Sequence, residues 1–335
     1  MKENLKDSQK INIAVIGAGY LGKFHAEKYS KLPTVNLVGV IDLDKDRATA
    51  IAELHHTQAF TQYQDILTKV DAVSIAVPTD QHYAVAKECL EAGLDVLIEK
   101  PITHKIWEAQ SLLRLAKEKD RIIQVGHLER FNPAIQKLTT ILTRPLFIEC
   151  HRLHSFVQRG TEVDVILDLM IHDLDIILSL VRSPVSKIHA IGVTVLSNHL
   201  DIANVRLEFE SGCVANITAS RVSLKAIRKI RLFQPDCYAA VDFHKSAIEI
   251  YKKTVSQGEQ PEISGDMIEF DKKDVLEEEI KAFVNAIQTR TPPLVSGKEA
   301  LEALKLAHDI LGTIRKSAHQ QYPDLVTQIS DFRLL

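Results

Sequence analysis

One helix-like stretch carries most of the side chains that could do acid–base chemistry. Residues 163–181 are apolar apart from a polar set that includes Asp164, Asp168, His172 and Asp175. At about 100° per residue, these four side chains fall along one face of a helix. Asp168 lies four residues before His172, so its carboxylate can set the tautomer of the imidazole and raise its basicity. The pattern indicates an acid–base pair for a substrate hydroxyl, although the same stripe could face water or hold a metal ion.

A second candidate is the lysine in Glu99-Lys100-Pro101, which follows the short apolar run Val96–Ile98. A lysine at the end of a parallel strand can hydrogen-bond a reacting oxygen and stabilise its alkoxide character. Pro101 restricts the backbone behind the lysine and so helps to fix its direction. The alternatives are a salt bridge between Lys100 and Glu99, or an ordinary surface lysine.

A glycine turn after the first apolar run predicts a dinucleotide site. The run Ile11–Ile16 is typical of a buried parallel strand, and a helical pattern begins just after Gly17-Ala18-Gly19-Tyr20-Leu21-Gly22. In this motif the first glycine allows a tight turn, the second lets backbone amides approach a pyrophosphate, and the third lets helix and strand pack closely. The helix N-terminus would bind the anion. We expect cofactor contacts from Gly17, Gly19, Tyr20, Leu21 and Gly22.

The next apolar run, Val35–Ile41, ends at an acid that bears on the choice of cofactor. Asp42 follows Gly22 by about 20 residues, where a carboxylate accepts both ribose hydroxyls. Its negative charge would repel a 2′-phosphate, so we expect NAD as the cofactor. Arg47 stands nearby in the sequence and leaves NADP as the alternative.

Apolar runs and helical patterns alternate as far as about residue 130, which predicts a Rossmann domain with a doubly wound parallel sheet over residues 1–130. Ligands of such sheets bind beyond the carboxyl ends of the strands. Besides the glycine turn and Asp42, the residues expected at those ends are Pro78, Thr79, Glu99, Lys100 and His127.

The pattern changes beyond about residue 130, and strand-like runs follow one another with little helix between them. They predict an α+β domain over residues 131–335 with a large, open, mostly antiparallel sheet. The polar segment 256–265 is predicted to be a surface loop, and two final helices near 275–289 and 298–317 could pack back on the first domain. Such a broad sheet favours a homodimer or homotetramer packed sheet to sheet.

Three arginines, Arg130, Arg152 and Arg159, precede or flank the acidic helix. Guanidinium groups match phosphate geometry, so they could clamp a diphosphate. They could equally form a solvated rim.

The bulk composition narrows the class of protein. The chain has 335 residues, 45% hydrophobic and 25% charged, with a net charge of −3, which gives no electrostatic case for nucleic acid or an anionic membrane. Its four cysteines lie far apart without a CxxC pair, which is typical of reduced thiols in a cytoplasmic protein. No apolar run approaches the roughly 20 residues of a membrane helix. The polar first ten residues lack the apolar region of a secretory signal.

Several segments together resemble the Gfo/Idh/MocA oxidoreductases over roughly residues 11–318. They are AVIGAGYLGKFHA (14–26), IAVPTDQH (75–82), IEKP (98–101) and the Asp-x-x-x-His of the acidic helix. Members of that family transfer hydride between NAD(P) and a sugar, cyclitol or similar carbinol, without a metal. The resemblance implies catalytic roles for Lys100, Asp168 and His172. It also implies that the glycine turn, Asp42, Pro78, Thr79, His82 and Glu99 line the cofactor.

A narrower resemblance is to bacterial dehydrogenases of UDP-N-acetylglucosamine, carried by VGHLERFNPA (125–134), HRLHSF (151–156) and RLFQPD (231–236) among others. Those enzymes oxidise the 3-hydroxyl to a ketone, which an aminotransferase then converts for lipid A. The resemblance implies a nucleotide-sugar substrate that contacts Arg130, Asn132, Arg152, Arg159, Asp168 and His172. The alternatives are a dehydrogenase of another sugar or an inositol-type cyclitol, a hydrolase or isomerase that uses NAD transiently, and a non-catalytic NAD-binding sensor.

Overall fold

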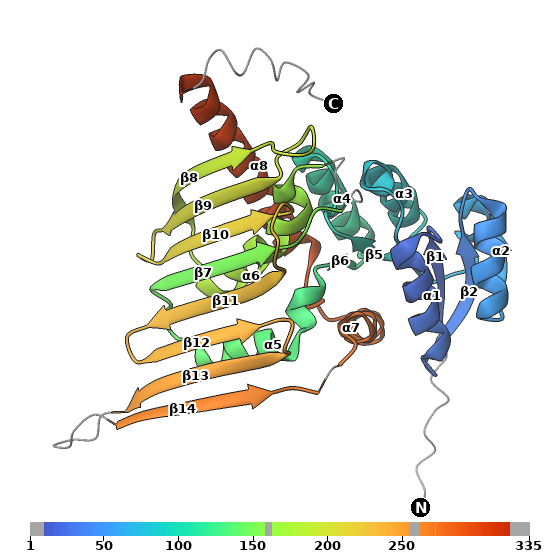
Figure 1. Cartoon of the computed structure of the whole chain (residues 1–335). Coiled ribbons are helices and arrows are strands. Elements are labelled where there is room, and N and C mark those ends of the chain that lie inside the picture. The colour runs from blue at the N-terminus through green and yellow to red at the C-terminus, as the bar shows by residue number, and fades with distance from the viewer. Residues whose placement is uncertain (1–9, 158–162, 255–261, 272, 322–335) are drawn as a thin grey trace, which may run out of the picture. The chain divides into compact units, whose positions relative to one another are not determined.

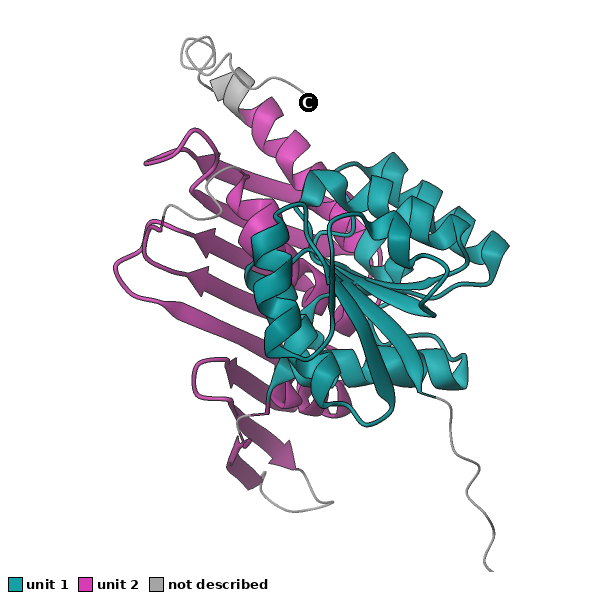
Figure 2. Ribbon diagram, turned by 90° about the vertical axis from the view of Figure 1, so that its right-hand side faces the viewer, with its two compact units in different colours: residues 1–131, 274–301 teal, residues 132–273, 302–335 magenta. Residues whose placement is uncertain are grey.

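The computed structural model describes residues 10–157, 163–254, 262–271 and 273–321 (Figure 1). The chain divides into two compact units, which Figure 2 colours separately: unit 1 is 1–131 with 274–301, and unit 2 is 132–273 with 302–335. The predicted domain boundary lies beside the division between Phe131 and Asn132. Residues 274–301 belong to unit 1 although the whole of the large sheet precedes them in the sequence.

Unit 1 is a doubly wound α/β domain, which confirms the predicted fold class. Its strands pair in parallel in the order β3-β2-β1-β4-β5-β6. They are β1 (Ile11–Ile16), β2 (Val35–Ile41), β3 (Gln58–Phe60), β4 (Ala72–Ile75), β5 (Asp95–Glu99) and β6 (Ile123–Gly126). The strand order changes direction between β1 and β4, and ligands of such sheets bind at the carboxyl ends beside that point.

Four helices of unit 1 lie between consecutive strands in the chain. They are α1 (Tyr20–Lys31), α2 (Lys45–Leu54), α3 (Thr79–Glu91) and α4 (Ile106–Lys119), with the short 3₁₀ turns η1 (Tyr63–Ile66) and η2 (Leu128–Phe131). The loops that join strand ends to these helices therefore carry most of the residues predicted to bind the cofactor.

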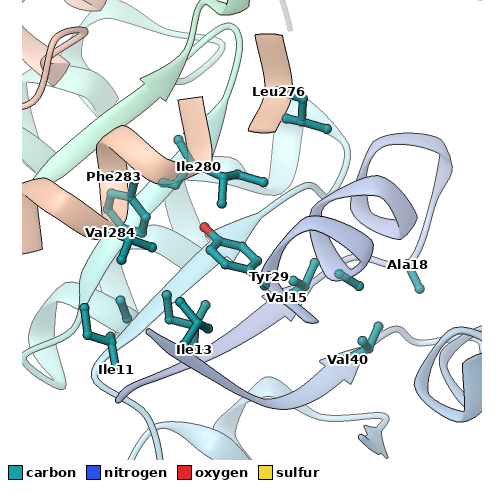
Figure 3. Close-up of a cluster of buried hydrophobic side chains, with 14 residues drawn as sticks. Ile11, Ile13, Val15, Ala18, Tyr29, Val40, Leu276, Ile280, Phe283 and Val284 are labelled. Atoms are coloured by element: carbon teal, nitrogen blue, oxygen red, sulfur yellow. The ribbon is translucent and has the colours of Figure 1, made fainter. Parts of the chain in front are cut away.

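Helix α7 (Val275–Thr289) completes the core of unit 1 from a distant part of the sequence. Its Ile280 and Phe283 are fully buried and belong to one cluster with Tyr29 of α1 and Ile13 of β1 (Figure 3). The apolar face of α7 is thus buried inside unit 1, where it packs against α1 and β1.

Unit 2 contains an eight-stranded sheet in the order β14-β13-β12-β11-β7-β10-β9-β8 (Figure 1). All its pairs are antiparallel except β7 with β10, which confirms the predicted mostly antiparallel sheet. The strands are β7 (Phe147–Leu153), β8 (Val185–Val193), β9 (Ile202–Phe209), β10 (Val214–Ser220), β11 (Ile227–Gln234), β12 (Cys237–Asp242), β13 (Ala247–Thr254) and β14 (Glu262–Glu269). The helices are α5 (Pro133–Ile141), α6 (Ile171–Val181) and α8 (Gly297–Gln321), of which α8 begins in unit 1.

The edge strand β14 corrects the prediction of a surface loop at 256–265, because residues 262–265 lie within this strand. Residues 256–261 lie outside the described residues. Nearly every residue of β14 is exposed, so the strand has no apolar alternation to reveal it. Its partner β13 supplies a specific contact, since a Cβ on Gly265 would lie 2.7 Å from the ring of Tyr251. The tyrosine ring therefore covers the glycine backbone at this edge.

Candidate active site

The glycine turn has the geometry that a pyrophosphate requires. Gly17 has φ +100°, and a Cβ there would lie 2.6 Å from the carbonyl oxygen of Ala76. A Cβ on Gly22 would overlap the carbonyl oxygen of Gly17, whereas nothing lies within 4 Å of the position of a Cβ on Gly19. No side chain caps the first turn of α1. The open space beside Gly19 and the uncapped helix N-terminus fit an anion there.

Asp42 lies directly against this turn. The Ala18 amide donates to its Oδ2 over 2.8 Å, and the Asp44 amide donates to its Oδ1 over 2.9 Å. The Arg47 guanidinium stands 3.6 Å from Asp42 Oδ2 and 3.3 Å from Asp44 Oδ2. The structure therefore brings together two groups of predicted cofactor residues that are separated by a whole strand in the sequence, and it pairs the nearby arginine with two carboxylates.

The turn after β4 ends at Pro78, and α3 begins at Thr79. His82 of α3 joins this turn to the turn after β5. One ring nitrogen of His82 lies 2.9 Å from the carbonyl oxygen of Pro101, and the other lies 3.0 Å from that of Val77. The side chain is buried, and this burial lowers its pKa despite the two carbonyl neighbours. His82 thus ties together two strand ends at the predicted cofactor edge.

Strand β5 ends at Glu99, and the following Lys100 is joined to Pro101 by a cis peptide. Glu99 Oε1 lies 2.9 Å from His25 Nε2, and the Lys100 amide donates to Glu99 Oε2 over 3.3 Å. Burial favours the neutral acid, but the hydrogen bond and charge of His25, with the charges of Lys100 and His82, hold the pKa of Glu99 below its usual value. Glu99 thus accepts a hydrogen bond from the Lys100 amide, and His25 is the imidazole partner that sequence reasoning missed.

The fifth predicted strand-end residue of this edge, His127, follows β6 and is buried. All the predicted cofactor residues of unit 1 therefore lie at the carboxyl ends of strands, in the adjoining turns, or in the first turn of the helix that follows. They are His127, the glycine turn, Asp42, Pro78, Thr79, His82, Glu99 and Lys100. Their roles toward a cofactor remain predictions, but their clustering follows directly from the parallel sheet.

The acidic helix of unit 2 corrects a second prediction. Residues 163–181 are not one α-helix, because a π-helical turn, η3 (Ile166–Met170), precedes α6. A π-turn is wider than an α-turn, so angles counted at 100° per residue do not hold across it, and such turns are frequent at functional sites. Asp168 lies in η3, while His172 lies in the first turn of α6.

Two carboxylates of the predicted stripe are buried rather than presented on a polar face. Asp164 precedes η3, and its Oδ1 accepts the Leu200 amide over 2.9 Å, so it holds the loop before β9. Asp175 is 2% exposed, whereas Asp168 and His172 are half-buried. Of the four stripe residues, Asp168 in η3 and His172 in α6 are the two that are not fully buried.

The predicted phosphate-binding arginines have partners inside their own units. Arg152 forms a buried two-point pair with Asp173, with 3.0 Å from Nε and 2.8 Å from Nη2 to the carboxylate oxygens. Arg130 donates to Glu299 over 3.2 Å. The Asn132 side chain caps α5 by accepting the Ala134 amide over 2.9 Å. Arg159 lies outside the described residues.

Two further properties concern metals and membranes. Among the described residues, no three or more His, Cys, Asp or Glu side chains are grouped so that they could hold a metal ion. Within the same part of the chain, no helix combines the length and the apolar character needed to cross a membrane.

Comparisons with known proteins agree with this architecture. The family described as "Oxidoreductase family, NAD-binding Rossmann fold" matches residues 11–127, and the GFO/IDH/MocA C-terminal domain matches residues 138–233. The chain is 39% identical over 296 residues to UDP-N-acetylglucosamine 3-dehydrogenase of Acidithiobacillus ferrooxidans, covering 86% of this chain and 93% of that protein. A solved structure of the enzyme of that name from the same organism is 36% identical, covers 91% of this chain and 97% of that one, and has a TM-score of 0.86.

A more distant relative acts on a cyclitol. Inositol 2-dehydrogenase of Corynebacterium glutamicum is 32% identical over 184 residues, covering 51% of this chain and 54% of that protein. The family matches span both units, and the dinucleotide turn lies in the matched Rossmann segment. This chain therefore belongs to the Gfo/Idh/MocA family of NAD-binding oxidoreductases.

Proposed function

We propose that this protein is an NAD-dependent dehydrogenase that oxidises a hydroxyl of a sugar nucleotide to a ketone. The proposed substrate is UDP-N-acetylglucosamine, oxidised at its 3-hydroxyl to supply an amino-sugar route toward lipid A. One observation carries the proposal: 39% identity to the Acidithiobacillus ferrooxidans enzyme extends over 86% of the chain, which is more than either unit alone. An inositol-type dehydrogenase is the alternative, supported by relatives that match a smaller share of the chain.

The contacts of Asp42 support NAD as the cofactor. Its carboxylate is anchored by the Ala18 amide next to the open face of Gly19, where it can accept ribose hydroxyls. The negative charge of Asp42 would repel the 2′-phosphate of NADP. Arg47, the nearby cation that could bind this phosphate, is already paired with two carboxylates. The residues that would hold NAD are those of the glycine turn with Asp42, Pro78, Thr79, His82, Glu99, Lys100 and His127.

Bound NAD supplies the hydride acceptor of the reaction. The side chains that we assign to proton transfer are Lys100 and His172, one of which accepts the proton of the sugar hydroxyl while the other donates a hydrogen bond to its oxygen. Asp168 orients the imidazole. Pro101 and the Glu99 carboxylate fix the backbone on either side of Lys100, which gives the ammonium a defined direction.

Arg130, Asn132, Arg152 and Arg159 remain our proposed contacts to the nucleotide sugar. The pairing of Arg152 with Asp173 uses its Nε and Nη2 donors, so a diphosphate would have to share this guanidinium. Arg130 likewise already pairs with Glu299. If these pairs persist in the complex, Arg152 serves to join β7 to α6 through Asp173.

The test is an absorbance screen at the NADH band with UDP-sugars and free cyclitols as substrates. We expect NADH formation with UDP-N-acetylglucosamine and a 3-keto product by mass spectrometry and NMR. NADH formation only with inositols would favour the alternative, and turnover without net NADH would favour transient use of NAD. Binding of NAD without turnover of any sugar would favour the sensor. The Lys100→Ala variant, assayed in parallel, controls for reduction by a contaminating enzyme.

We also propose a homodimer or homotetramer that packs through the open face of the sheet in unit 2. Phe147, Phe233, Tyr238 and Tyr251 are cross-strand partners on β7, β11, β12 and β13, with ring centroids 5.6, 5.1 and 6.0 Å apart in turn. Their neighbours along each strand, such as Ile148 and Leu232, are fully buried, so the aromatic row lies on the other face. A second copy would cover it.

The remaining proposals concern the cellular setting. Cys89, Cys150, Cys213 and Cys237 are all free and buried, which supports a reducing compartment such as the cytoplasm. The 3-keto product would need an aminotransferase as the next enzyme, since a ketone is the acceptor for transamination.

A further inference from the structure

A continuous set of buried polar side chains joins α1, β4 and the end of β5 inside unit 1. His25 Nε2 lies 2.9 Å from Glu99 Oε1, and His25 Nδ1 lies 3.0 Å from Ser74 Oγ. The Tyr29 hydroxyl lies 3.0 Å from the same Ser74 oxygen. All four side chains are nearly or fully buried, with exposed fractions of 0 to 5%. We call this set the Tyr29–Ser74–His25–Glu99 chain.

The carboxylate at the end of this chain has little freedom to move. One oxygen of Glu99 faces His25, and the other accepts the Lys100 amide. Gly126 of β6 makes room for it, because a Cβ there would lie 2.9 Å from Glu99 Oε2. The imidazole of His25, the amide of Lys100 and strand β6 at Gly126 therefore restrict the Glu99 carboxylate. Through its hydrogen bond to the Lys100 amide, the carboxylate in turn restricts the backbone of Lys100.

A second buried acid stands behind the chain. Glu279 of α7 is fully buried, and among the described residues neither of its carboxyl oxygens has a hydrogen-bond partner. Burial, and then the charge of Glu99, raise the pKa of Glu279 well above its usual range, which favours the neutral form of this acid. The charged or titratable groups that face Glu99 are thus His25 from α1, His82 from α3, Lys100 beside it and Glu279 from α7.

We propose that His25 is a positioning residue for Lys100 and acts through Glu99. The proposal rests on the dehydrogenase function proposed above, in which Lys100 contacts the reacting oxygen. The ring of His25 is itself fixed by Ser74 and Tyr29, so it presents Nε2 to one carboxylate oxygen and leaves the other to accept the Lys100 amide. Without the imidazole, the buried carboxyl loses its closest partner and takes up a proton at higher pH. A protonated or rotated Glu99 no longer holds the turn, and Lys100 loses its direction.

Two substitutions of His25 separate positioning from mere packing. His25→Leu fills the space but cannot donate to Glu99, whereas His25→Gln retains an amide donor close to the position of Nε2. We expect His25→Leu to lower kcat by at least about tenfold, since small misplacements of a reacting group are costly, while KM for NAD changes by less than about threefold. His25→Gln should restore most of kcat. The acid limb of the kcat–pH profile should move to higher pH by about one unit in His25→Leu.

Other outcomes would overturn the inference. If kcat and KM changed together in proportion to a lowered Tm, with the acid limb unmoved, His25 would be a structural residue only. Unchanged kcat in His25→Leu would exclude the positioning role. Ser74→Ala serves as the graded control, because it removes the link between His25 and Tyr29 but keeps the contact between His25 and Glu99. Its kcat should lie between those of the wild type and His25→Leu.

A readout without substrate keeps this inference separate from the proposed function. The carboxyl carbon of Glu99 can be followed by NMR in protein labelled with ¹³C-glutamate, with Glu99→Gln used for its assignment. We expect the pKa of Glu99 to be higher in His25→Leu than in the wild type by about one unit or more. An unchanged titration would overturn the inference whatever the activity. A shifted titration in a protein that oxidises no sugar would count against the proposed function alone.

Discussion

Asp42 has two carboxylate oxygens with different partners, and this arrangement bears on cofactor choice. Oδ2 accepts the Ala18 amide of the glycine turn, while Oδ1 accepts the Asp44 amide. We expect Asp42→Ala to weaken NAD binding by about tenfold, because a charge-assisted hydrogen bond to the ribose is lost. The NAD/NADP ratio of kcat/KM should narrow by a similar factor, because the repulsion of a 2′-phosphate is lost as well.

Asp44→Ala is the matched control for Asp42. It removes a neighbouring carboxylate that caps α2 and pairs with Arg47, whereas the contact with the Ala18 amide of the glycine turn belongs to Asp42. This variant should lose about 1 kcal/mol of stability through the lost cap. Its NAD/NADP ratio should change less than that of Asp42→Ala, because Arg47 keeps its contact with Asp42. Equal ratios in the wild type and Asp42→Ala would remove Asp42 from the site.

Lys100 and His172 are the residues whose loss should affect chemistry rather than cofactor binding. We expect Lys100→Ala and His172→Ala to abolish turnover of the sugar while the Kd for NAD, measured by NADH fluorescence or calorimetry, stays within about threefold. Lys87→Ala and His189→Ala remove the same residue types at exposed positions and should turn over normally. Normal kcat in either site variant would refute its assignment.

At the residue scale, the sequence indicated which side chains could take part in the chemistry, but it did not indicate which other side chains they contact. The glycine turn, Asp42 and Lys100 could be predicted because they follow apolar strands at recognisable spacings. His25 could not, since an imidazole within a helix gives no sign of whether it faces water or a carboxylate from a strand more than seventy residues away. The only signal was its place in the helix that directly follows the glycine turn.

Among the elements, the loop before β9 is held by Asp201 as well as by Asp164. Burial would raise the pKa of Asp201, but the Ser197 hydroxyl and the amides of residues 195–197 hydrogen-bond the carboxylate and lower its pKa to about 2. A pKa below the unfolded value means stability that is present above about pH 4 and is lost as the pH falls toward 2. We expect Asp201→Asn to lower the stability of unit 2 by about 2 kcal/mol at pH 7, measured as a lower Tm.

The pH dependence distinguishes this charge effect from a packing effect. The difference in Tm between Asp201→Asn and the wild type should shrink between about pH 4 and pH 2, because the wild-type carboxylate becomes protonated there. A difference that stays constant over this range would mean that the shape of the side chain, and not its charge, stabilises the loop.

Helix α7 and the π-turn η3 show what a hydrophobic pattern leaves open. The amphipathic pattern of residues 275–289 predicts the helix and its buried face, but it does not say which sheet that face covers. The apolar run of 163–181 predicts a helix, but periodicity cannot detect one wide turn at its start. Strand β14 has no periodic signal at all, because it lies exposed at a sheet edge.

Phe283 makes the place of α7 testable. Its side chain is fully buried in the core of unit 1 beside Tyr29 and Ile13, so Phe283→Ala should cost about 3–5 kcal/mol in the free energy of unfolding. Lys281→Ala, on the exposed side of the same helix, should leave this free energy nearly unchanged. Urea unfolding followed by fluorescence and circular dichroism would measure both values. A cost near that of the control would place α7 outside the core.

At the scale of the whole molecule, the open face of the large sheet is the part that the sequence described least. Alternation along β7, β11, β12 and β13 predicts that each strand has two faces. Only the structure shows which residues of neighbouring strands lie side by side on one face, namely Phe147, Phe233, Tyr238 and Tyr251. Tyr251 is 53% exposed within the single chain. Rows of aromatic side chains that remain exposed are typical of surfaces that another chain covers.

The proposed oligomer can therefore be tested on this aromatic row. If a second copy covers it, the wild type should have the mass of a dimer or tetramer in light scattering, and Phe233→Glu with Tyr251→Glu should give a monomer, because the buried charges would lack partners. Leu54→Glu on α2, exposed and distant in sequence, is the control and should leave the mass unchanged. A wild-type monomer, or an oligomer that survives the double substitution, would show that the aromatic row is not the interface. Since unit 1 retains its own core, the monomeric variant should still bind NAD.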